Sequence, residues 1–439
     1  MERGHAVAIG GHGGLGEVLT YSNLILSYLS QIRLTKVFIS LDPRTNPYAP
    51  GAGYPPPELA GRDDVIERAA IALDRIRQGR AARSFILYGL RGVGKTVLLN
   101  RVRVDAEARG FASATIEAPE ERSLPAVLIP ALRAALLKLS RGEALRAALA
   151  GAMGALASFA SKMKVKYQDI EVGIDFTPQT GIADSGDLGL DLADLVGTLG
   201  TAAKERTTAM ALFIDELQYV PEDQLGALIF ALHQASQNQL PVTMVAAGLP
   251  QLVGQTGRAK SYAERLFEFI SIDRLDEAAG TAALCKPAEA QGVRFANEAV
   301  GEILNETQGY PYFIQEWGKH CWNIAADSPI AVADAKAASA TALAELDASF
   351  FRVRFDRLTP TEKRYLRAMA DLGLGPHRSG DIAERMCRKV EGVAPIRNAL
   401  ISKGMIYSPA HGDTAFTVPL FDGFMKRTIP TFEKPKRRA

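Results

Sequence analysis

The chain has 439 residues, of which 47% are hydrophobic and 23% charged, a composition that is ordinary for a soluble globular protein. Its length is too great for one ordinary core, so we expect two or three domains. Its three cysteines (Cys285, Cys321 and Cys387) lie far apart without a CxxC pair, and its six histidines form no HExxH spacing. These patterns argue against a disulfide scaffold or zinc ribbon and favour a reducing, cytoplasmic location.

The net charge of +2 is distributed unevenly along the chain. Residues 350–439 hold 18 Lys and Arg against 9 Asp and Glu, whereas the remaining residues hold 33 against 40. A basic C-terminal quarter indicates a surface for a polyanion, although a solvated basic tail at residues 434–438 is the plainer alternative. We expect no membrane span, because residues 24–41, the most apolar stretch near the start, contain a glutamine and two basic residues. The N-terminus also lacks the basic region and cleavage site of a secretory signal.

Residues 1–57 are expected to form a poorly ordered extension and a Pro/Gly-rich linker. Residues 6–16 contain G-x-G-x-x-G, the fingerprint of a dinucleotide site. A Rossmann half needs several alternating strands and helices, however, and here the pattern ends at once in a Pro/Gly-rich run over residues 43–57. We therefore favour a flexible extension over a cofactor site. A misassigned start codon, with translation beginning near Val37, is a third alternative.

The next segment predicts a phosphate-binding loop. Apolar residues recur at helical spacing over residues 63–79, and residues 84–88 are a short apolar strand. The strand leads into GLRGVGKT and then into a predicted helix over residues 97–110. A strand, a glycine-rich loop and a helix in this order are typical of a P-loop, whose backbone N–H groups surround the phosphates of a nucleotide. The loop consists of Gly89, Leu90, Arg91, Gly92, Val93, Gly94, Lys95 and Thr96.

Two residues of this loop have side chains with specific expected roles. Lys95 should reach the β- and γ-phosphates, and the Thr96 hydroxyl should ligate Mg²⁺. A second strand, Ala211 to Ile214, ends in the acidic pair Asp215-Glu216. This is the pattern of a Walker B motif, in which Asp215 would hold the magnesium ion and Glu216 would polarise the attacking water. The carboxylates favour a hydrolase over a protein that only binds ATP. We expect no metal other than this Mg²⁺.

Further strands and helices complete an expected parallel sheet with helices on both faces. Strands are predicted over residues 113–119 and 241–252, and a helix over residues 224–237. The connector over residues 123–205 is unusually long. It contains Ala/Leu-rich helices, an alternating hairpin strand at residues 170–176 and a helix over residues 187–205. The connector is either a partner-binding insertion or a packed elaboration, and the sequence leaves both open.

The C-terminal part predicts a helical lid followed by a winged helix-turn-helix. Thr359, Pro360 and Glu362 form a helix start with a Thr cap, an early proline and an acid in the first turn. Three helices are predicted over residues 361–373, 378–386 and 394–406, the last ending at Gly404. Residues 406–419 predict two strands around the turn His411-Gly412-Asp413. The third helix and the residues before it could contact DNA through Arg388, Lys389, Arg397, Asn398 and Lys403.

Four motifs in order carry a family resemblance: GRDD, GLRGVGKT, LFIDELQ and GYPYFIQ. They resemble the AAA+/STAND group of P-loop ATPases, in particular origin-recognition and initiator-like ATPases, transposition helpers and archaeal-type ATPases, over residues 58–430. The resemblance implies Glu216 as the catalytic base and places Arg62 beside the adenine. It also places Arg265 where relatives carry an arginine finger that reaches a neighbouring subunit. The alternative for Arg265 is an ordinary surface residue paired with Glu264 or Glu268.

Two departures from the family pattern favour a slow switch over a fast motor. The strand after Walker B ends in VAAGLP without a polar sensor residue, and GYPYFIQ lacks the arginine of a second sensor. A G-x-P at this point resembles STAND and archaeal-type ATPases, in which the lid motif senses the nucleotide.

We therefore expect an α/β P-loop NTPase fold of the ASCE/AAA+ kind with a helical lid and a C-terminal winged helix. The expected domains are the extension (1–57), the ATPase domain (58–275, with an insertion at about 140–190), the lid (276–349), the winged helix (350–430) and a basic tail (431–439). The expected function is an ATP- and Mg²⁺-dependent ATPase switch that engages double-stranded DNA, and the protein could also form a homo-oligomer. The alternatives are a regulator that binds a protein partner through the winged helix, and a protein that keeps ATP as a structural ligand.

Overall fold

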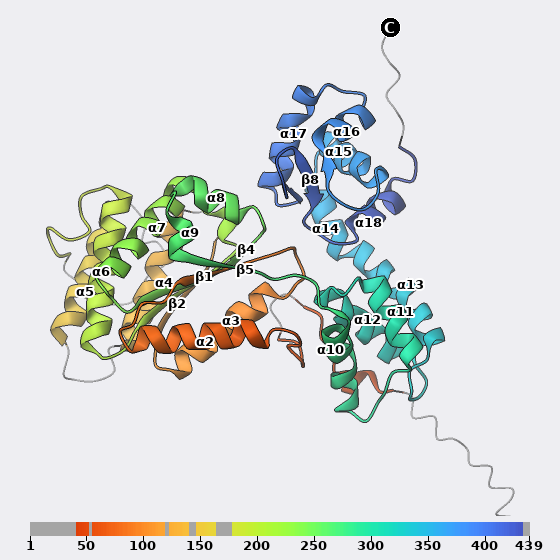
Figure 1. The fold of residues 1–439 in the computed structure, drawn as a ribbon, viewed down its shortest axis with the longest axis horizontal. Helices are drawn as coiled ribbons and strands as arrows, with labels where there is room; N and C mark the ends of the chain where they lie inside the picture. The colour runs from red at the N-terminus through yellow and green to blue at the C-terminus, as the bar shows by residue number, and fades with distance from the viewer. Residues whose placement is uncertain (1–40, 52–54, 119–122, 140–145, 164–177, 433–439) are drawn as a thin grey trace, which may run out of the picture.

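A five-stranded parallel sheet forms the centre of the first domain (Figure 1). The structure, a computed structural model, describes residues 41–51, 55–118, 123–139, 146–163 and 178–432. The strand order is β2-β3-β4-β1-β5, so after β1 the chain passes β4 and β3 to form β2 at the edge of the sheet. The strands are β1 (Ser84–Tyr88), β2 (Ala112–Glu117), β3 (Met210–Asp215), β4 (Val242–Gly248) and β5 (Phe267–Ser271). Because all five are parallel, their carboxyl ends meet at one edge, where ligands of such sheets bind.

Helices cover both faces of the sheet, because alternate strand residues point to opposite sides. Phe85 and Leu87 of β1 pack with α2 and α3, whereas Ile86 packs with the larger group of helices on the other face. The helices of this P-loop domain (residues 55–273) are α2 (Asp63–Arg77), α3 (Lys95–Ala108), α4 (Leu124–Leu139), α5 (Arg146–Lys162), α6 (Leu188–Glu205), η3 (Leu217–Tyr219), α7 (Glu222–Gln237), α8 (Leu252–Ala259) and α9 (Ala263–Leu266).

The connector between β2 and β3 packs as part of the core. α4, α5 and α6 contribute buried leucine, alanine and phenylalanine side chains to the same core as β3. The predicted helix over residues 187–205 is confirmed as α6, capped by the Asp187 side chain. The predicted hairpin strand at residues 170–176 lies outside the described residues, as do the glycine-rich residues 6–16 and all but two residues of the predicted tail.

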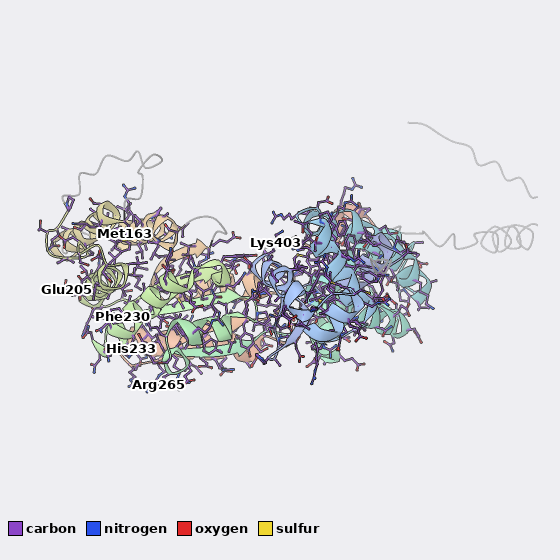
Figure 2. All side chains as sticks on the ribbon, turned by 90° about the horizontal axis from the view of Figure 1, so that it is seen from above. Met163, Glu205, Phe230, His233, Arg265 and Lys403 are labelled. Carbon is purple, nitrogen blue, oxygen red and sulfur yellow. The ribbon has the colours of Figure 1, made fainter. Side chains whose placement is uncertain are left out.

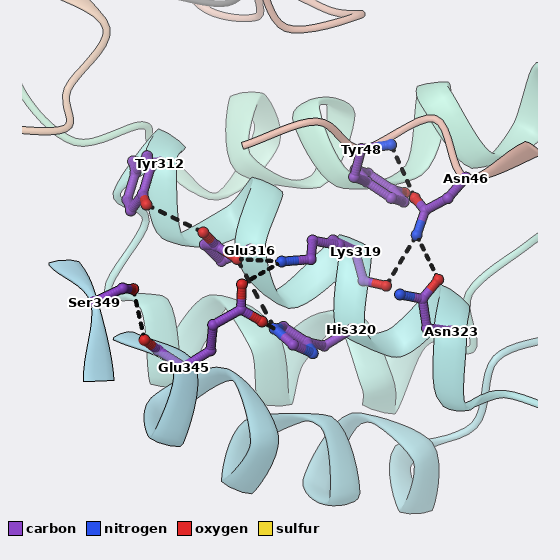
Figure 3. Close-up of polar contacts among 9 residues, drawn as sticks. All are labelled: Asn46, Tyr48, Tyr312, Glu316, Lys319, His320, Asn323, Glu345 and Ser349. Atoms are coloured by element: carbon purple, nitrogen blue, oxygen red, sulfur yellow. Dashed lines mark hydrogen bonds and ion pairs between the residues drawn. The ribbon is translucent and has the colours of Figure 1, made fainter. Parts of the chain in front are cut away.

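A bundle of five helices follows the sheet: α10 (Glu277–Glu289), α11 (Asn297–Thr307), α12 (Pro311–Ile324), α13 (Val332–Ala348) and α14 (Phe350–Asp356). Our prediction of poor order is wrong for residues 41–51, which pack against this bundle and include η1 (Pro43–Thr45). Tyr48 is 3% exposed, and its hydroxyl donates a hydrogen bond to the Leu284 carbonyl. Asn46 Nδ2 donates to Lys319 O at 3.0 Å (Figure 3). Burial of one aromatic ring and satisfied polar contacts explain why this short segment is ordered.

The C-terminal domain consists of α15 (Pro360–Asp371), α16 (Ser379–Arg385), α17 (Val390–Ser402), α18 (Phe421–Thr428) and an antiparallel sheet, β6 (His377–Arg378), β8 (Asp413–Phe416) and β7 (Ile406–Tyr407), in the order β6-β8-β7. The predicted start of α15 is confirmed, because the Thr359 hydroxyl accepts from Glu362 N and Glu362 accepts from Thr359 N. Gly404 has the predicted left-handed conformation, with φ of 64°. β6 and α18 are elements that we did not predict. The bundle and this domain share one continuous core.

Candidate nucleotide site

The loop after β1 has the backbone of a phosphate cradle. Gly92 and Gly94 have φ of 81° and 91°, a conformation that residues with a Cβ rarely adopt, so these positions favour glycine. α3 begins at Lys95, and its N-terminal N–H groups face the loop. Lys95 is only 8% exposed, and its Nζ donates to Leu90 O at 2.7 Å. Burial lowers the pKa of Lys95 to about 8, although Glu216 and Asp215 act in the opposite direction.

The structure brings the end of β3 to the start of α3. Thr96 Oγ1 donates to Asp215 Oδ2 at 2.6 Å, and Glu216 N donates to Asp215 Oδ1 at 2.8 Å. Burial raises the pKa of Asp215, while the bond from Thr96 opposes that rise. A hydroxyl and a carboxylate at this separation are hard oxygen donors of the kind Mg²⁺ prefers, so the two residues fit the expected ion.

Glu216 is held by two side chains from separate segments. It has φ of 51° at the end of β3, a left-handed conformation that is uncommon for residues with a Cβ. Arg91 Nη1 lies 3.4 Å from Glu216 Oε1, and Gln218 Nε2 donates to the other carboxylate oxygen. Gln218 Oε1 in turn accepts from Leu249 N at 3.0 Å. The tip of β4, where our sequence analysis found no polar sensor, is therefore tied to Glu216 through Gln218.

A cavity of about 340 Å³ opens beside the phosphate loop. The cavity is lined by residues 49–51 of the N-terminal segment, the residues just before α2, the loop, Glu216 and the helical bundle. Arg62 also lines it, and its Nη2 donates to Val93 O at 3.3 Å and to the carbonyl of Asp273. Burial lowers the pKa of Arg62. The volume and mixed lining suit a small ligand such as a nucleotide.

The loop is bonded directly to the two other parts of the molecule. Tyr312 N, at the start of α12, donates to Gly92 O at 3.1 Å. Arg91 N donates to Thr417 O of the C-terminal domain at 2.9 Å. The side chain of Arg91 also reaches Tyr219, with Nη2 2.8 Å from the hydroxyl. The phosphate loop thus contacts both the bundle and the C-terminal domain.

Arg265 does not belong to the cavity of its own chain. It is exposed on α9, on the surface of the P-loop domain (Figure 2), and is not among the cavity residues. The expected alternative, a pair with Glu264 or Glu268, is also not found among the described ion pairs, and Glu268 pairs with Arg68 instead. A role that reaches into a neighbouring subunit therefore stays a prediction.

The five candidate DNA contacts divide into two groups. Arg397 Nη2 donates to Asp413 O at 3.0 Å, and Lys403 Nζ lies 2.8 Å from Glu362 Oε2, so both bind within the domain. Asn398 and Lys403 line a groove that faces the P-loop domain. Arg388 and Lys389, by contrast, are exposed just before α17.

Sequence reasoning missed several residues that line the cavity, namely Phe350, Arg354 and residues 49–51. Tyr312 and Gln315 also line it, and both belong to GYPYFIQ, the stretch that resembles a nucleotide-sensing lid motif. The i, i+4 spacing of Phe350 and Arg354 in FFRVRF puts these two side chains on one helical face, but nothing local shows that this face meets the phosphate loop. The positions of residues 49–51 depend on packing across the chain and had no local signal.

One acidic cluster in the bundle already contains its own cation (Figure 3). Glu316, His320 and Glu345 lie close enough to hold a metal ion. Lys319 Nζ, however, lies 2.7 Å from Glu345 Oε1 and 3.5 Å from Glu316 Oε2. The lysine ammonium therefore supplies the positive charge that these carboxylates need, and the cluster braces α12 against α13.

This fold and this site define the first domain as a P-loop NTPase domain, as expected. Residues 58–245 match the family described as "AAA ATPase domain", and residues 348–425 match one described as "Domain of unknown function (DUF8462)". The AAA+ part of the resemblance is thus confirmed over residues 58–245. No curated protein matches the chain. Within the described residues, no helix is both long enough and apolar enough to cross a bilayer.

Several solved structures are similar to this chain at low sequence identity. The Walker-type ATPase PABY2304 of Pyrococcus abyssi is 16% identical, with 84% of this chain and 96% of that chain covered and a TM-score of 0.53. The Aeropyrum pernix Orc1 protein in complex with DNA is 18% identical, with 85% and 94% covered and a TM-score of 0.43. The Thermotoga maritima RuvB Holliday junction branch migration motor is 14% identical, with 88% and 100% covered and a TM-score of 0.42.

Proposed function

We propose that this protein is an ATP-hydrolysing switch in which the state of the nucleotide controls the position of the C-terminal domain. The observation that carries the proposal is the phosphate loop itself. Its backbone bonds to α12 through Gly92 and to the C-terminal domain through Arg91, beside a pair of carboxylates at the end of β3. A ligand that reshapes this loop changes both contacts at once.

Each residue of the site has a defined chemical task in this proposal. Lys95 and the N–H groups at the start of α3 bind the phosphates. Thr96 and Asp215 hold Mg²⁺, which neutralises charge on the phosphates when it is bound. Glu216 accepts a proton from the attacking water, and Arg91 and Gln218 hold its carboxylate in place. Arg62 borders the base end of the cavity.

The C-terminal domain is proposed to be a winged helix-turn-helix that receives this signal. Three helices, α15 to α17, and a small antiparallel sheet support the assignment. We propose the division expected from sequence, except that residues 41–51 and α14 (Phe350–Asp356) join the lid. Duplex DNA is the proposed effector, because Arg388 and Lys389 are exposed on a basic domain.

A protein-docking role for the C-terminal domain is the second candidate. It is favoured by Asn398 and Lys403, which line a groove together with residues of the P-loop domain, so this side of α17 lies opposite protein. Salt dependence separates the two candidates, since DNA affinity falls steeply as salt is raised.

In a homo-oligomer, Arg265 would act on the γ-phosphate of a neighbour. Its Ala variant should then lose turnover that added wild-type subunits restore only in part.

The direct test of hydrolysis is Glu216→Gln. We expect turnover of ATP to fall at least about 100-fold while Mg²⁺-ATP still raises the melting temperature, because the amide keeps the shape of the side chain but accepts no proton. Glu67→Gln, at an exposed site on α2, is the matched control and should leave both quantities unchanged. Unaltered turnover in the Glu216 variant would reject the assigned base. Turnover absent from the wild-type protein, with ATP bound, would favour ATP as a structural ligand.

A further inference from the structure

Arg354 reaches the nucleotide cavity from α14, a helix outside every nucleotide motif in the sequence. It lines the same cavity as Lys95, Thr96 and Glu216. Its Nη1 donates to Phe350 O at 2.6 Å, and the guanidinium lies 4.1 Å from the centre of the Phe350 ring. These contacts fix the direction of the side chain without neutralising its charge.

The guanidinium of Arg354 lacks a carboxylate partner among the described residues. No described Asp or Glu oxygen lies within 4.0 Å of it, whereas Arg91 in the same cavity pairs with Glu216. Burial lowers the pKa of Arg354 to about 10, and the nearby charge of Arg91 acts in the same direction. A half-buried, unpaired guanidinium beside a phosphate loop is favourable only when an anion joins it.

We propose that Arg354 binds the terminal phosphate of the nucleotide and that α14 carries this engagement to the C-terminal domain. The inference rests on the proposed binding of ATP. Arg354 lines the cavity together with Lys95 and with Glu216, the residue expected to face the γ-phosphate, and this shared lining points to the terminal-phosphate end. Arg354 thereby supplies the arginine that GYPYFIQ lacks, from a different helix.

α14 has two functional faces, set by the i, i+4 spacing of a helix. Phe350 and Arg354 line the cavity. Phe351 and Phe355, one residue further along, pack on Phe424 of α18, with ring centres 5.3 Å and 5.6 Å apart. A short helix packed in this way moves as a unit. A shift that brings Arg354 to a phosphate therefore also displaces the rings that hold α18.

The cavity face of α14 is braced against the phosphate loop. The rings of Tyr312 and Phe350 stack with centres 4.9 Å apart, and Tyr312 N donates to Gly92 O at 3.1 Å. The loop, the stack and Arg354 form one connected set of contacts. Arg354 can bind the terminal phosphate of ATP, which ADP lacks. The two nucleotides therefore interact differently with α14, as a switch requires.

Arg352 provides a matched control on the same helix. Its side chain is 55% exposed, and its Nε lies 3.1 Å from Asp356 Oδ1. It points away from the cavity, since it is not among the lining residues. Replacement of Arg352 removes one arginine from α14 without removing the proposed phosphate contact.

The test compares Arg354→Met, Arg354→Lys and Arg352→Met in the full chain, each checked for native folding by circular dichroism. Affinities for ATP and ADP are measured by calorimetry with Mg²⁺. We expect Arg354→Met to lower the affinity for ATP by about 10- to 100-fold and the affinity for ADP by less than threefold. Arg354→Lys should recover part of the loss, and Arg352→Met should bind both nucleotides like wild type.

Hydrogen exchange of α18 is the second measurement. All exchange measurements use the Glu216→Gln background, which prevents turnover. In this background, with or without Arg352→Met, we expect exchange over Phe421–Thr428 to differ between the ATP and ADP complexes. In Arg354→Met at saturating ATP, the difference should disappear. Equal ATP affinity, or an unchanged difference in α18, would overturn this inference alone. A wild-type protein that binds no ATP would overturn the proposed function as well.

Discussion

The basic side chains of the nucleotide site and those of the C-terminal domain differ in whether they pair with carboxylates of the protein. In the site, the cations Lys95 and Arg354 converge on a cavity with no carboxylate within 4.0 Å of either among the described residues. In the C-terminal domain, Arg367 and Lys403 each form an ion pair with an acidic residue of the same domain, at 3.3 and 2.8 Å, and Arg427 pairs with Asp347 of α13 at 2.7 Å. The domain with the larger positive balance in sequence therefore uses part of that charge in ion pairs within the protein.

The difference teaches that a count of charges does not locate an anion site. What locates it is positive charge held away from water and left without a protein partner, because that arrangement is unfavourable until an anion binds. By this criterion the strongest anion site of the described residues is the phosphate loop together with Arg354. The exposed pair Arg388 and Lys389 is a weaker candidate, since water already solvates it.

The largest effect is expected from Lys95→Met. Removal of the buried ammonium should lower ATP affinity by at least about 100-fold, so that Mg²⁺-ATP no longer raises the melting temperature. The melting temperature without nucleotide should hold or rise, because a desolvated charge is replaced by an apolar chain of similar length. Lys204→Met, at an exposed site on α6, is the control for the loss of a lysine. An equal rise of the melting temperature on addition of Mg²⁺-ATP in both variants would contradict the assignment of Lys95.

A second experiment separates the phosphate loop from the C-terminal domain. A Cβ at Gly404 would lie 3.0 Å from Arg91 Nη2 and 3.1 Å from the Tyr219 hydroxyl, whereas one at Gly412 would meet nothing within 4 Å. Both glycines have positive φ, so an alanine at either costs roughly 1–2 kcal/mol in the backbone. We expect only Gly404→Ala to loosen the interface, seen as faster hydrogen exchange at the phosphate loop and α17. Equal exchange in the two variants would show that the contact with Arg91 does not hold the domains together.

The exposed basic pair gives a smaller expected effect. Arg388→Ala/Lys389→Ala should weaken binding of duplex DNA and reduce the slope of log affinity against log salt by about 1.8, because each phosphate that a basic side chain neutralises adds about 0.9 to this slope. Fluorescence anisotropy at several salt concentrations measures the slope. Arg77→Ala/Lys204→Ala removes the same charge from exposed sites on the P-loop domain and should leave the slope unchanged. Failure of the wild-type protein to bind duplex DNA at low salt would instead favour the protein-docking role.

The contrast between local and distant contacts explains what the sequence could predict. The loop Gly89–Thr96 and the pair Asp215-Glu216 were predictable, because neighbouring residues set the backbone of a glycine-rich loop and of a strand end. The helix start at Thr359 was predictable for the same reason. Arg354 and Tyr48 were not, because their surroundings come from segments far away in the chain. Tyr48 and its partner Leu284, for example, are 236 residues apart.

The smallest effect tests internal pairing in the C-terminal domain. Glu362 is buried, which by itself raises the pKa of its carboxyl, but hydrogen bonds from Lys403 and Thr359 outweigh burial and lower the pKa below 4.5. A carboxyl whose pKa is lower in the folded state stabilises the protein above pH 4.5, and this contribution is lost as the pH falls through the folded-state value.

Glu362→Gln keeps an acceptor for Thr359 N but loses the charge that pairs with Lys403. The free energy of unfolding at pH 7 should therefore fall by about 1 kcal/mol. As the pH falls below 4.5 the variant and wild type should converge, and the difference should vanish below the lowered folded-state pKa, where the wild-type carboxyl is protonated. Urea unfolding from pH 3 to 7 measures both quantities, and Glu384→Gln, at an exposed site on α16, is the control. A constant difference across this pH range would mean that Glu362 acts through shape and not through charge, and that the internal pairing of basic residues stabilises this domain less than its geometry indicates.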